Sequence, residues 1–516
     1  MCGIAAVIDV RPGEERATEA AGLGRSMLGR LHHRGPDGHG DAQPGASWLG
    51  HTRLAIVDLD GGAQPMRSDD GWWVVANGEV YNHDRLRDEL SVQGRRLRTA
   101  SDSEVVLHAV AAWGAEGVRR MRGMFAFCVV GPRGEAVLGR DPLGIKPLYW
   151  AHLDGRVLVA SELAAFPEEH RDRVEEFPPG HTWTAESGLR PLVDLRADPT
   201  GEGAVAAPFR SRTEAVEAVR EAVVSAVRQR MMADVPLGVF LSGGLDSSIV
   251  AAVMAREAPP GTTIRSFAAG TADSSDLDAA RRVAEHLGLE HHERVYTDDE
   301  VLDVLPDVVR STESYEPSLV RSAVPNYLLS ELAARHVKVV LTGEGADELF
   351  AGYHHLRGLS VEELRDELVR GVEVLHHLNL QRADRVSMAH GLEARVPFLA
   401  VEVLAVAQRV PVEWKLLGED GRAQAQEKAL LREAFDGWLP DDILWRRKEQ
   451  FGDGSGTAAV MARRAATFVP DEHWQGEVLP GLPPARTREE FGYQRIFAEH
   501  LGGVRADQVL GSWPEA

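Results

Sequence analysis

The second residue of the chain is a cysteine, in the start Met1-Cys2-Gly3-Ile4. A small residue after the initiator methionine usually permits its removal, which would leave Cys2 with a free α-amine of pKa about 7.7–8.0. Such an amine can act as general base for the thiol of its own residue, as in N-terminal nucleophiles. Because a cysteine can follow a start methionine by chance, this interpretation depends on further segments.

Three segments supply groups that attack on an amide requires: Gly50–Asp58 (GHTRLAIVD), Asn77–Asn82 (NGEVYN) and Ser101–Glu104 (SDSE). The side-chain amide of Asn77 beside the N–H of Gly78 suits a developing oxyanion. In a free amino-acid amide such as glutamine, Arg53 can fork onto the carboxylate, and Asp102 or Glu79 can pair with the ammonium. Taken alone, each of these residues is better explained as part of a surface ion pair or a turn.

A second kind of chemistry is indicated by Ser242–Ser248 (SGGLDSS), which follows the apolar segment Val235–Leu241 and opens a helical pattern. Glycines let backbone N–H groups approach phosphate oxygens, a helix N-terminus favours an anion, and serine hydroxyls add donors. No GK[ST] ending follows, so this is not the loop used in γ-phosphoryl transfer. The segment predicts a pyrophosphate-binding loop, and an ordinary strand–helix turn is the alternative.

A related loop, Thr342–Glu348 (TGEGADE), follows the apolar segment Val337–Leu341. In a parallel sheet, both loops lie at the carboxyl edge, where ligands bind. Asp246 and Asp347 are then candidate Mg²⁺ ligands, since Mg²⁺ typically takes one or two carboxylates with phosphate oxygens and waters. Glu344 is a candidate general base for incoming ammonium or a tetrahedral adduct. The alternative is that these acids cap the following helix.

The elements that must position these groups change in character along the chain. The first part predicts an α+β layered arrangement of many short strands and few helices, punctuated by Gly, Pro, Asn and Asp. The expected strands are Ile4–Val10, Ala46–Val57, Trp72–Asn77, Phe125–Val130, Ala136–Arg140, Leu148–Ala151 and Val157–Ser161. The expected helices are Ala17–Leu31, His83–Gln93 and Ser103–Trp113.

The second part predicts an α/β domain with a doubly wound parallel sheet, because strands and helices alternate. The expected strands are Val235–Leu241, Thr263–Ala269, His291–Tyr296 and Val337–Leu341, and the expected helices are Glu214–Met232, Leu277–Leu287, Asp299–Ser311 and Ala323–Arg335. Beyond Gly345 the pattern is mostly helical. Arg196–Pro208 is rich in Gly, Ala and Pro and is interpreted as a linker, which divides the chain into 2–195, 196–208 and 209–516.

The bulk properties exclude several classes of function. The chain has 516 residues and a formal net charge of −22, which disfavours nucleic acid as a partner. Its two cysteines form no disulfide framework and fit a reducing compartment. Because neither a signal peptide nor an apolar run of membrane-spanning length is found, we expect a cytoplasmic protein with no membrane partner. Association into a homodimer is left open.

The motifs resemble a known family when they are taken together. MCGI, RLHHRGPDG (30–38), GHTRLAIVD, NGEVYN, SDSEVVL and RDPLGIKPLYW (140–150) match, in order and spacing, the glutaminase domain of class II amidotransferases, in the asparagine synthetase branch. SGGLDSS, WRRKEQF (445–451) and the segments 378–399 and 487–500 are similar to the synthetase domain of that family. The resemblance therefore spans nearly the whole chain.

The resemblance implies an αββα N-terminal nucleophile hydrolase fold followed by an adenine nucleotide alpha hydrolase-like fold. It also implies an activity: ammonia is released from glutamine and passed through a tunnel to aspartate, activated by ATP and Mg²⁺ as β-aspartyl-AMP, with AMP and pyrophosphate as further products. The implied catalytic residues are Cys2, Asn77, Gly78, Glu344 and Lys448. The implied glutamine-binding residues are Arg53, Val57, Asn77, Glu79 and Asp102.

The same resemblance, together with the position of the loops, assigns the nucleotide and acceptor residues. The ATP-binding candidates are Leu241, Ser242, Gly243, Gly244, Asp246, Ser247, Ser248, Phe267, Ala268, Thr342 and Gly343. The metal candidates are Asp246 and Asp347. The acceptor candidates are Arg321, Glu348, Arg382, Asp384 and Arg395, and a structural ion pair is the alternative for each of them.

Small departures from the family pattern bear on the acceptor. Ser318 and Leu319 stand where a threonine pair is frequent, Ala400 replaces an aspartate, and Ala351 replaces a glycine. An amidotransferase of the same chemistry with another carboxylate acceptor is therefore the main alternative. A cyclising β-lactam synthetase-like enzyme would not need the glutaminase residues, a non-catalytic regulator would not need either set, and the negative charge disfavours a tRNA-modifying enzyme.

Overall fold

Two antiparallel sheets face each other in the N-terminal part of the computed structural model, which describes residues 2–10, 14–201, 203, 207–416, 426–448, 451–469 and 478–511. The first sheet has the order β10-β8-β9-β1-β3-β2, with β10 Val174–Glu176, β8 Tyr149–Leu153, β9 Arg156–Ala160, β1 Gly3–Asp9, β3 Trp48–Arg53 and β2 Gly38–Ala42. The second has the order β12-β11-β7-β6-β5-β4, with β12 Gly188–Pro191, β11 His181–Thr184, β7 Ala136–Arg140, β6 Gly123–Val130, β5 Trp73–Val80 and β4 Met66–Arg67.

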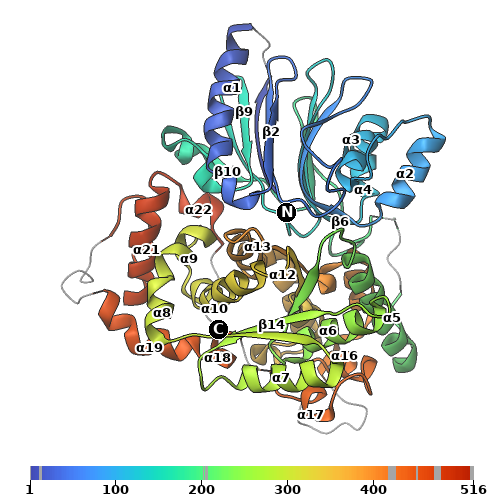
Figure 1. The fold of residues 1–516 in the computed structure, drawn as a ribbon, viewed down its shortest axis with the longest axis vertical. Coiled ribbons are helices and arrows are strands. Elements are labelled where there is room, and N and C mark those ends of the chain that lie inside the picture. The colour runs from blue at the N-terminus through green and yellow to red at the C-terminus, as the bar shows by residue number, and fades with distance from the viewer. Residues whose placement is uncertain are drawn as a thin grey trace.

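Helices cover the outer faces of these two sheets (Figure 1). In strand β1, residues 4–8 are all apolar because both faces are covered: Ala5 and Val7 pack toward α1 (Glu14–Gly29), while Ile4, Ala6 and Ile8 pack between the sheets. Successive side chains of a strand point to opposite faces, so a strand with two covered faces is apolar throughout. On the other side, α2 (His83–Val92) and α3 (Asp102–Trp113) pack on the second sheet. The layers are therefore αββα, as predicted.

The C-terminal part contains a five-stranded sheet in which every neighbouring pair is parallel. Its order is β15 Glu290–Val295, β14 Arg265–Gly270, β13 Leu237–Phe240, β16 Val339–Leu341 and β17 Glu393–Arg395. On one face Val239 packs with α5 (Arg212–Arg230), α6 (Leu245–Glu257) and α7 (Ser275–Leu287); on the other, Phe240 packs with α10 (Pro317–Ala334). The predicted doubly wound fold is confirmed.

The strand order places a topological switch point at β13. The chain runs from β13 outward through β14 to β15, and then returns to β16 on the opposite side of β13. Ligands of such sheets bind beyond the carboxyl ends of the strands at this crevice. The loops that follow β13 and β16 are the two glycine-rich segments singled out from the sequence, so the fold brings them together.

Helices make up most of the chain after β16, as expected. They are α11 Ala346–Phe350, α12 Val361–Val374, α13 Asn379–Met388, α14 Val401–Arg409, α15 Val412–Leu416, α16 Ala429–Ala434, α17 Asp441–Leu444, α18 Phe451–Gly454, α19 Thr457–Phe468, α21 Arg488–Leu501 and α22 Ala506–Val509. The N-terminal part also has the short helix α4 Ala115–Arg119.

Several boundaries differ from the prediction. The expected helix Asp299–Ser311 is two helices, α8 Asp298–Asp303 and α9 Leu305–Thr312, with Pro306 in the first turn of the second. Helix α10 begins at Pro317, six positions earlier than expected, and contains Pro325. The edge strands β2, β4, β10, β12 and β17 and the inner strand β11 were not predicted, because most are short and some are polar. The segment 196–208 is only partly described, so its role as a linker stays a prediction.

Among the described residues, no helix is long and apolar enough to cross a membrane.

Candidate active sites

Cys2, directly before β1, makes three contacts through its backbone and its sulfur. Its N–H donates to Asn77 Oδ1 at 2.9 Å, its carbonyl accepts a hydrogen bond from Arg34 Nε at 3.0 Å, and its Sγ lies 4.0 Å from the carbonyl oxygen of Leu54. Burial raises the pKa of the Cys2 thiol. The thiol is therefore protonated at neutral pH and needs a base to become a nucleophile.

Asn77 and Gly78 lie on β5 next to this cysteine. The Asn77 side chain is fully buried, and its Nδ2 has no hydrogen-bond partner among the described residues. A buried donor without a partner is costly unless a ligand uses it. Gly78 has φ +133°, and a Cβ there would lie 1.9 Å from the carbonyl oxygen of Met124, so no other residue fits. Asn77 thus contacts Cys2 and has a free donor, and the role of Asn77 and Gly78 as an oxyanion hole stays a prediction.

The other glutamine-binding candidates surround the same strand end. Arg53 donates to the carbonyl oxygens of Asp58 and Leu59 at 2.7 and 2.9 Å, which orients its guanidinium. Asp102 accepts a hydrogen bond from the N–H of Val80 at 2.7 Å, directly after Glu79. Val57 is half-buried. The structure thus places Arg53 on β3, Glu79 on β5 and Asp102 at the start of α3, while Val57 lies in the segment between β3 and β4.

Glu79 is in an unusual electrostatic position. Burial, with further repulsion from Glu393 and Asp102, raises the pKa of its carboxyl well above the ordinary value. Its Oε1 lies 3.4 Å from Arg395 Nη2, and its Oε2 has no hydrogen-bond partner within the described ranges. A ligand ammonium would satisfy this oxygen and favour the charged form.

A cavity of about 410 Å³ lies at the carboxyl ends of β13 and β16. Of the predicted ATP-binding residues, it is lined by Leu241, Ser242, Gly244, Asp246, Ser247, Ala268, Thr342 and Gly343. The two loops touch: a Cβ on Gly343 would lie 2.8 Å from the Cβ of Asp246. Gly243, Ser248 and Phe267 are not part of the lining; Phe267 is fully buried and stacks on His292.

Two carboxylates and two ammonium groups meet in this cavity. Lys428 Nζ lies 2.5 Å from Asp246 Oδ2 and 2.7 Å from Asp347 Oδ1, while Lys448 Nζ lies 2.8 Å from Asp347 Oδ2. Although burial acts in the opposite direction, Lys428 and Lys448 hold the pKa of Asp347 below its ordinary value. Both aspartates and both lysines line the cavity, so all four charges are available to an anionic ligand.

The pair of aspartates fits a divalent cation. Asp246 and Asp347 approach one ammonium nitrogen from opposite loops, so one cation can contact both carboxylates. Asp246 Oδ1 is buried and has no hydrogen-bond partner in the part of the chain that the structure describes. Hard carboxylate oxygens with space for phosphate oxygens and water are the ligand set that Mg²⁺ prefers.

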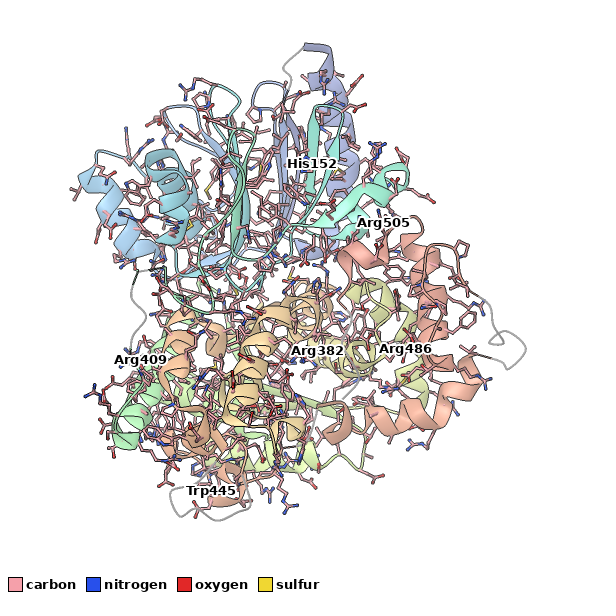
Figure 2. All side chains as sticks on the ribbon, turned by 180° about the vertical axis from the view of Figure 1, so that it is seen from behind. His152, Arg382, Arg409, Trp445, Arg486 and Arg505 are labelled. Atoms are coloured by element: carbon pink, nitrogen blue, oxygen red, sulfur yellow. The ribbon has the colours of Figure 1, made fainter. Side chains whose placement is uncertain are left out.

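Glu344 and Arg382 form an ion pair across the cavity wall. Arg382 lies on α13, among the helices of the C-terminal part (Figure 2). Glu348, also in the lining, accepts hydrogen bonds from Tyr353 Oη at 2.5 Å and Asn379 Nδ2 at 3.1 Å. Burial and the charge of Asp347 raise the pKa of Glu348 to about 7.

The structure does not bring all acceptor candidates to this cavity. Arg321, Glu348 and Arg382 line it, and Arg321 Nε pairs with Glu489 at 2.9 Å. Asp384 instead faces the N-terminal part, 2.9 Å from Arg34 Nη2, because it points from α13 in another direction than Arg382. Arg395 lies on the edge strand β17 and pairs with Glu393 and Glu79. We therefore remove Asp384 and Arg395 from the acceptor set.

Some positions that depart from the family pattern also line the cavity. Ser318 and Leu319 are part of the lining, whereas Ala400 is buried at the start of α14 and is not. Of the positions that depart from the family pattern, those in the first turn of α10 are therefore better placed to select the acceptor carboxylate than the one after β17.

Sequence reasoning missed three residues of these sites. Lys428 precedes the apolar helix α16 in the sequence EKALLREA, and its position next to a helix gave no signal of a ligand. Arg34 lies within the RLHHRGPDG motif without a role assigned to it. Glu393, beside Arg395, follows no catalytic pattern. All three are buried charges, which a local sequence window does not reveal.

Comparisons with known proteins agree with the two parts of the structure. A glutamine amidotransferase domain model matches residues 1–185, and an asparagine synthase model matches residues 218–365 and 357–512. A probable glutamine-hydrolysing asparagine synthetase of Dictyostelium discoideum is 36% identical over 546 residues, covering 99% of this chain and 96% of that protein. The glutamine-hydrolysing asparagine synthetase of Asparagus officinalis is 38% identical, covering 96% of this chain and 85% of that protein. A probable glutamine-hydrolysing asparagine synthetase of Schizosaccharomyces pombe is 38% identical, covering 100% of this chain and 96% of that protein.

Proposed function

The chain belongs to the glutamine-hydrolysing asparagine synthetase family, and from this premise we propose that it makes asparagine from aspartate, glutamine and ATP. The observation that carries the proposal is the presence of two complete constellations on one chain. One is a half-buried cysteine beside an unpartnered amide donor, and the other is a cavity with two aspartates and two lysines.

In the first reaction, the Cys2 thiolate attacks the side-chain amide carbon of glutamine. After removal of Met1, the α-amine of Cys2 takes the thiol proton and later delivers it to the leaving ammonia. Asn77 Nδ2 and the N–H of Gly78 stabilise the oxyanion, since the former has no other partner. Arg53 binds the carboxylate of glutamine, and Glu79 and Asp102 bind its ammonium. Water then hydrolyses the thioester to glutamate.

In the second reaction, the side-chain carboxylate of aspartate attacks the α-phosphorus of ATP. The loop Ser242–Ser248 holds the phosphates, and Lys428 and Lys448 offset the charge of the departing pyrophosphate. Ammonia attacks the acyl carbon, Glu344 accepts the excess proton, and AMP leaves. Arg382 holds the Glu344 carboxylate in place.

Asp246 and Asp347 would hold Mg²⁺ in this cavity. The ion would neutralise charge on the phosphate oxygens of bound ATP. For the acceptor, we propose aspartate, with an amidotransferase acting on another carboxylate as the alternative suggested by Ser318 and Leu319 in the lining.

The test is to incubate the full-length protein with glutamine, ATP, Mg²⁺ and aspartate and to quantify glutamate, AMP and asparagine by mass spectrometry. We expect all three products. Glutamate formation without asparagine would move the assignment to another acceptor. Cys2→Ala should abolish the use of glutamine and leave synthesis from ammonium intact, whereas loss of both would contradict the division into two sites.

A further inference from the structure

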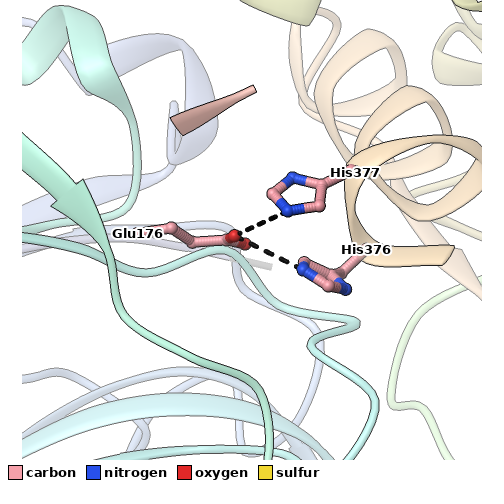
Figure 3. A group of neighbouring side chains, drawn as sticks. All are labelled: Glu176, His376 and His377. Atoms are coloured by element: carbon pink, nitrogen blue, oxygen red, sulfur yellow. Dashed lines mark ion pairs between the residues drawn. The ribbon is translucent and has the colours of Figure 1, made fainter. Parts of the chain in front are cut away.

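Three side chains from distant parts of the sequence converge at the border of the two parts, and none of them belongs to the lining of the nucleotide cavity. Glu176 lies on β10 in the N-terminal part, and His376 and His377 end the 3-10 helix η5 (Leu375–His377) in the C-terminal part. Figure 3 shows the two imidazole rings pointing at the Glu176 carboxylate. One possible ligand atom from each residue lies within 4.8 Å of the other two.

Both rings approach the same carboxylate oxygen. Nε2 of His376 lies 3.4 Å from Glu176 Oε2, and Nε2 of His377 lies 3.3 Å from that oxygen. Charge-assisted hydrogen bonds are shorter, about 2.7–2.9 Å. Two ligands of a tetrahedral Zn²⁺, each about 2.0–2.1 Å from the ion, are separated by about 3.3 Å. The observed distances are therefore those of neighbouring ligands around one ion.

The groups around the Glu176 carboxylate and the two imidazole rings favour the binding of an ion. Arg140 Nη1 donates to the other oxygen, Glu176 Oε1, at 2.7 Å, which fixes the carboxylate and leaves Oε2 directed at the rings. A hydrogen bond to the oxygen that does not face the ion orients a metal-binding carboxylate in this way. The three side chains are between 11% and 23% exposed, so water can reach the fourth position. His376 Nδ1 is buried without a hydrogen-bond partner among the residues described.

We propose that Glu176, His376 and His377 bind a divalent transition-metal ion of the Zn²⁺ class, with water as the fourth ligand. Two imidazoles and one carboxylate favour Zn²⁺ over Mg²⁺, which prefers oxygen ligands. Because the ligands come from both parts of the chain, the ion would fasten β10 to the segment that leads into α13.

The test is Zn²⁺ binding to the full-length chain with the Cys2→Ala change, which removes the competing thiol, in excess Mg²⁺ to occupy the aspartate pair. Bound metal is measured by competition with a chromophoric chelator and by mass spectrometry of the metal after gel filtration. Co²⁺ substitution gives an independent readout, because a tetrahedral site produces intense visible d–d bands. We expect one equivalent of Zn²⁺ to be lost in His376→Gln/His377→Gln and in Glu176→Gln.

The matched control is His291→Gln/His292→Gln, another pair of consecutive histidines. Those two rings lie near different carboxylates, Glu293 and Glu290, at 3.1 and 2.9 Å, so they share no central point. The control should retain the equivalent of Zn²⁺ and the Co²⁺ bands. If the double histidine variant does not fold, the nearly isosteric Glu176→Gln decides the outcome. Equal binding by the Cys2→Ala chain with and without Glu176→Gln, or the absence of Co²⁺ bands in the Cys2→Ala chain, would overturn the proposal.

Discussion

Arg34 and Asp384 form a buried ion pair between the two parts of the chain, with Nη2 and Oδ2 2.9 Å apart. Nε of the same guanidinium donates to the carbonyl of Cys2, and Asp384 lies on α13 two residues after Arg382. Arg382 in turn pairs with Glu344 in the nucleotide cavity. One guanidinium and one helix therefore connect the backbone of the proposed nucleophile with the proposed base of the second reaction.

This connection predicts the effect of Asp384→Asn. Removing one partner of a buried ion pair typically costs about 3–5 kcal/mol, because the other charge stays buried. Arg34 keeps its contact with Glu162, so we expect glutamine hydrolysis to persist while nitrogen transfer to the second site becomes inefficient. The ratio of glutamate to asparagine formed, measured by mass spectrometry, should rise above that of wild type. Synthesis from ammonium should remain.

The control for that change is Asp307→Asn. Asp307 is 57% exposed and pairs with Arg310 at 3.1 Å within one helix. Exposed pairs contribute about 0–1 kcal/mol, so the product ratio should equal that of wild type. An unchanged ratio in Asp384→Asn as well would show that the ion pair does not couple the two sites.

A second prediction concerns the unpartnered amide of Asn77. Asn77→Ala removes one donor from the proposed oxyanion hole, and loss of one such donor typically lowers kcat by about 10²–10³. We expect that decrease in glutamine hydrolysis, measured as glutamate release, with synthesis from ammonium unaffected. A rise in KM without a change in kcat would instead indicate that Asn77 binds the ground state of glutamine.

Local motifs predicted the chemistry of both sites, because the reacting groups lie in short segments with their own turn geometry. Gly78 and Gly243 illustrate this, since both have positive φ values, the former within β5 and the latter in the loop after β13. The alternation of strands and helices likewise predicted the parallel sheet. What the sequence did not predict depends on contacts between distant segments. Arg395 ends the three-residue strand β17, and only the folded chain shows that this strand is at the edge of its sheet and that Arg395 pairs with Glu79.

A third prediction concerns Lys428, which was not among the residues predicted from the sequence. Lys428→Ala would leave Asp246 and Asp347 with less positive charge between them and would remove one of the two ammonium groups near the phosphates. We expect AMP formation to fall by about 10²–10³ with either nitrogen source, a typical effect of losing one preorganised electrostatic contact. Glutamine hydrolysis should continue.

Lys338→Ala provides the comparison for Lys428→Ala. Lys338 is 37% exposed and pairs with Asp37 at 2.7 Å, outside both sites. AMP formation measured by chromatography should match that of wild type in this variant. Normal AMP formation in Lys428→Ala would exclude Lys428 from the second reaction.

The fourth prediction uses the raised pKa of Glu348. Burial, followed by the charge of the neighbouring Asp347, raises the pKa of Glu348 to about 7, against about 4.3 in an unfolded chain. Between these two values the native state binds more protons than the unfolded state, so the stability contributed by this group falls as the pH rises from about 4.3 to about 7 and then levels off.

Glu348→Gln retains the contacts with Tyr353 and Asn379 but cannot titrate. The unfolding midpoint of wild type, minus that of the variant, should therefore decrease across this pH range. The control is Glu362→Gln, at an exposed position on α12, whose unfolding midpoint should equal that of wild type at every pH. If the difference in midpoint between wild type and Glu348→Gln does not change with pH, the assigned protonation of Glu348 is contradicted.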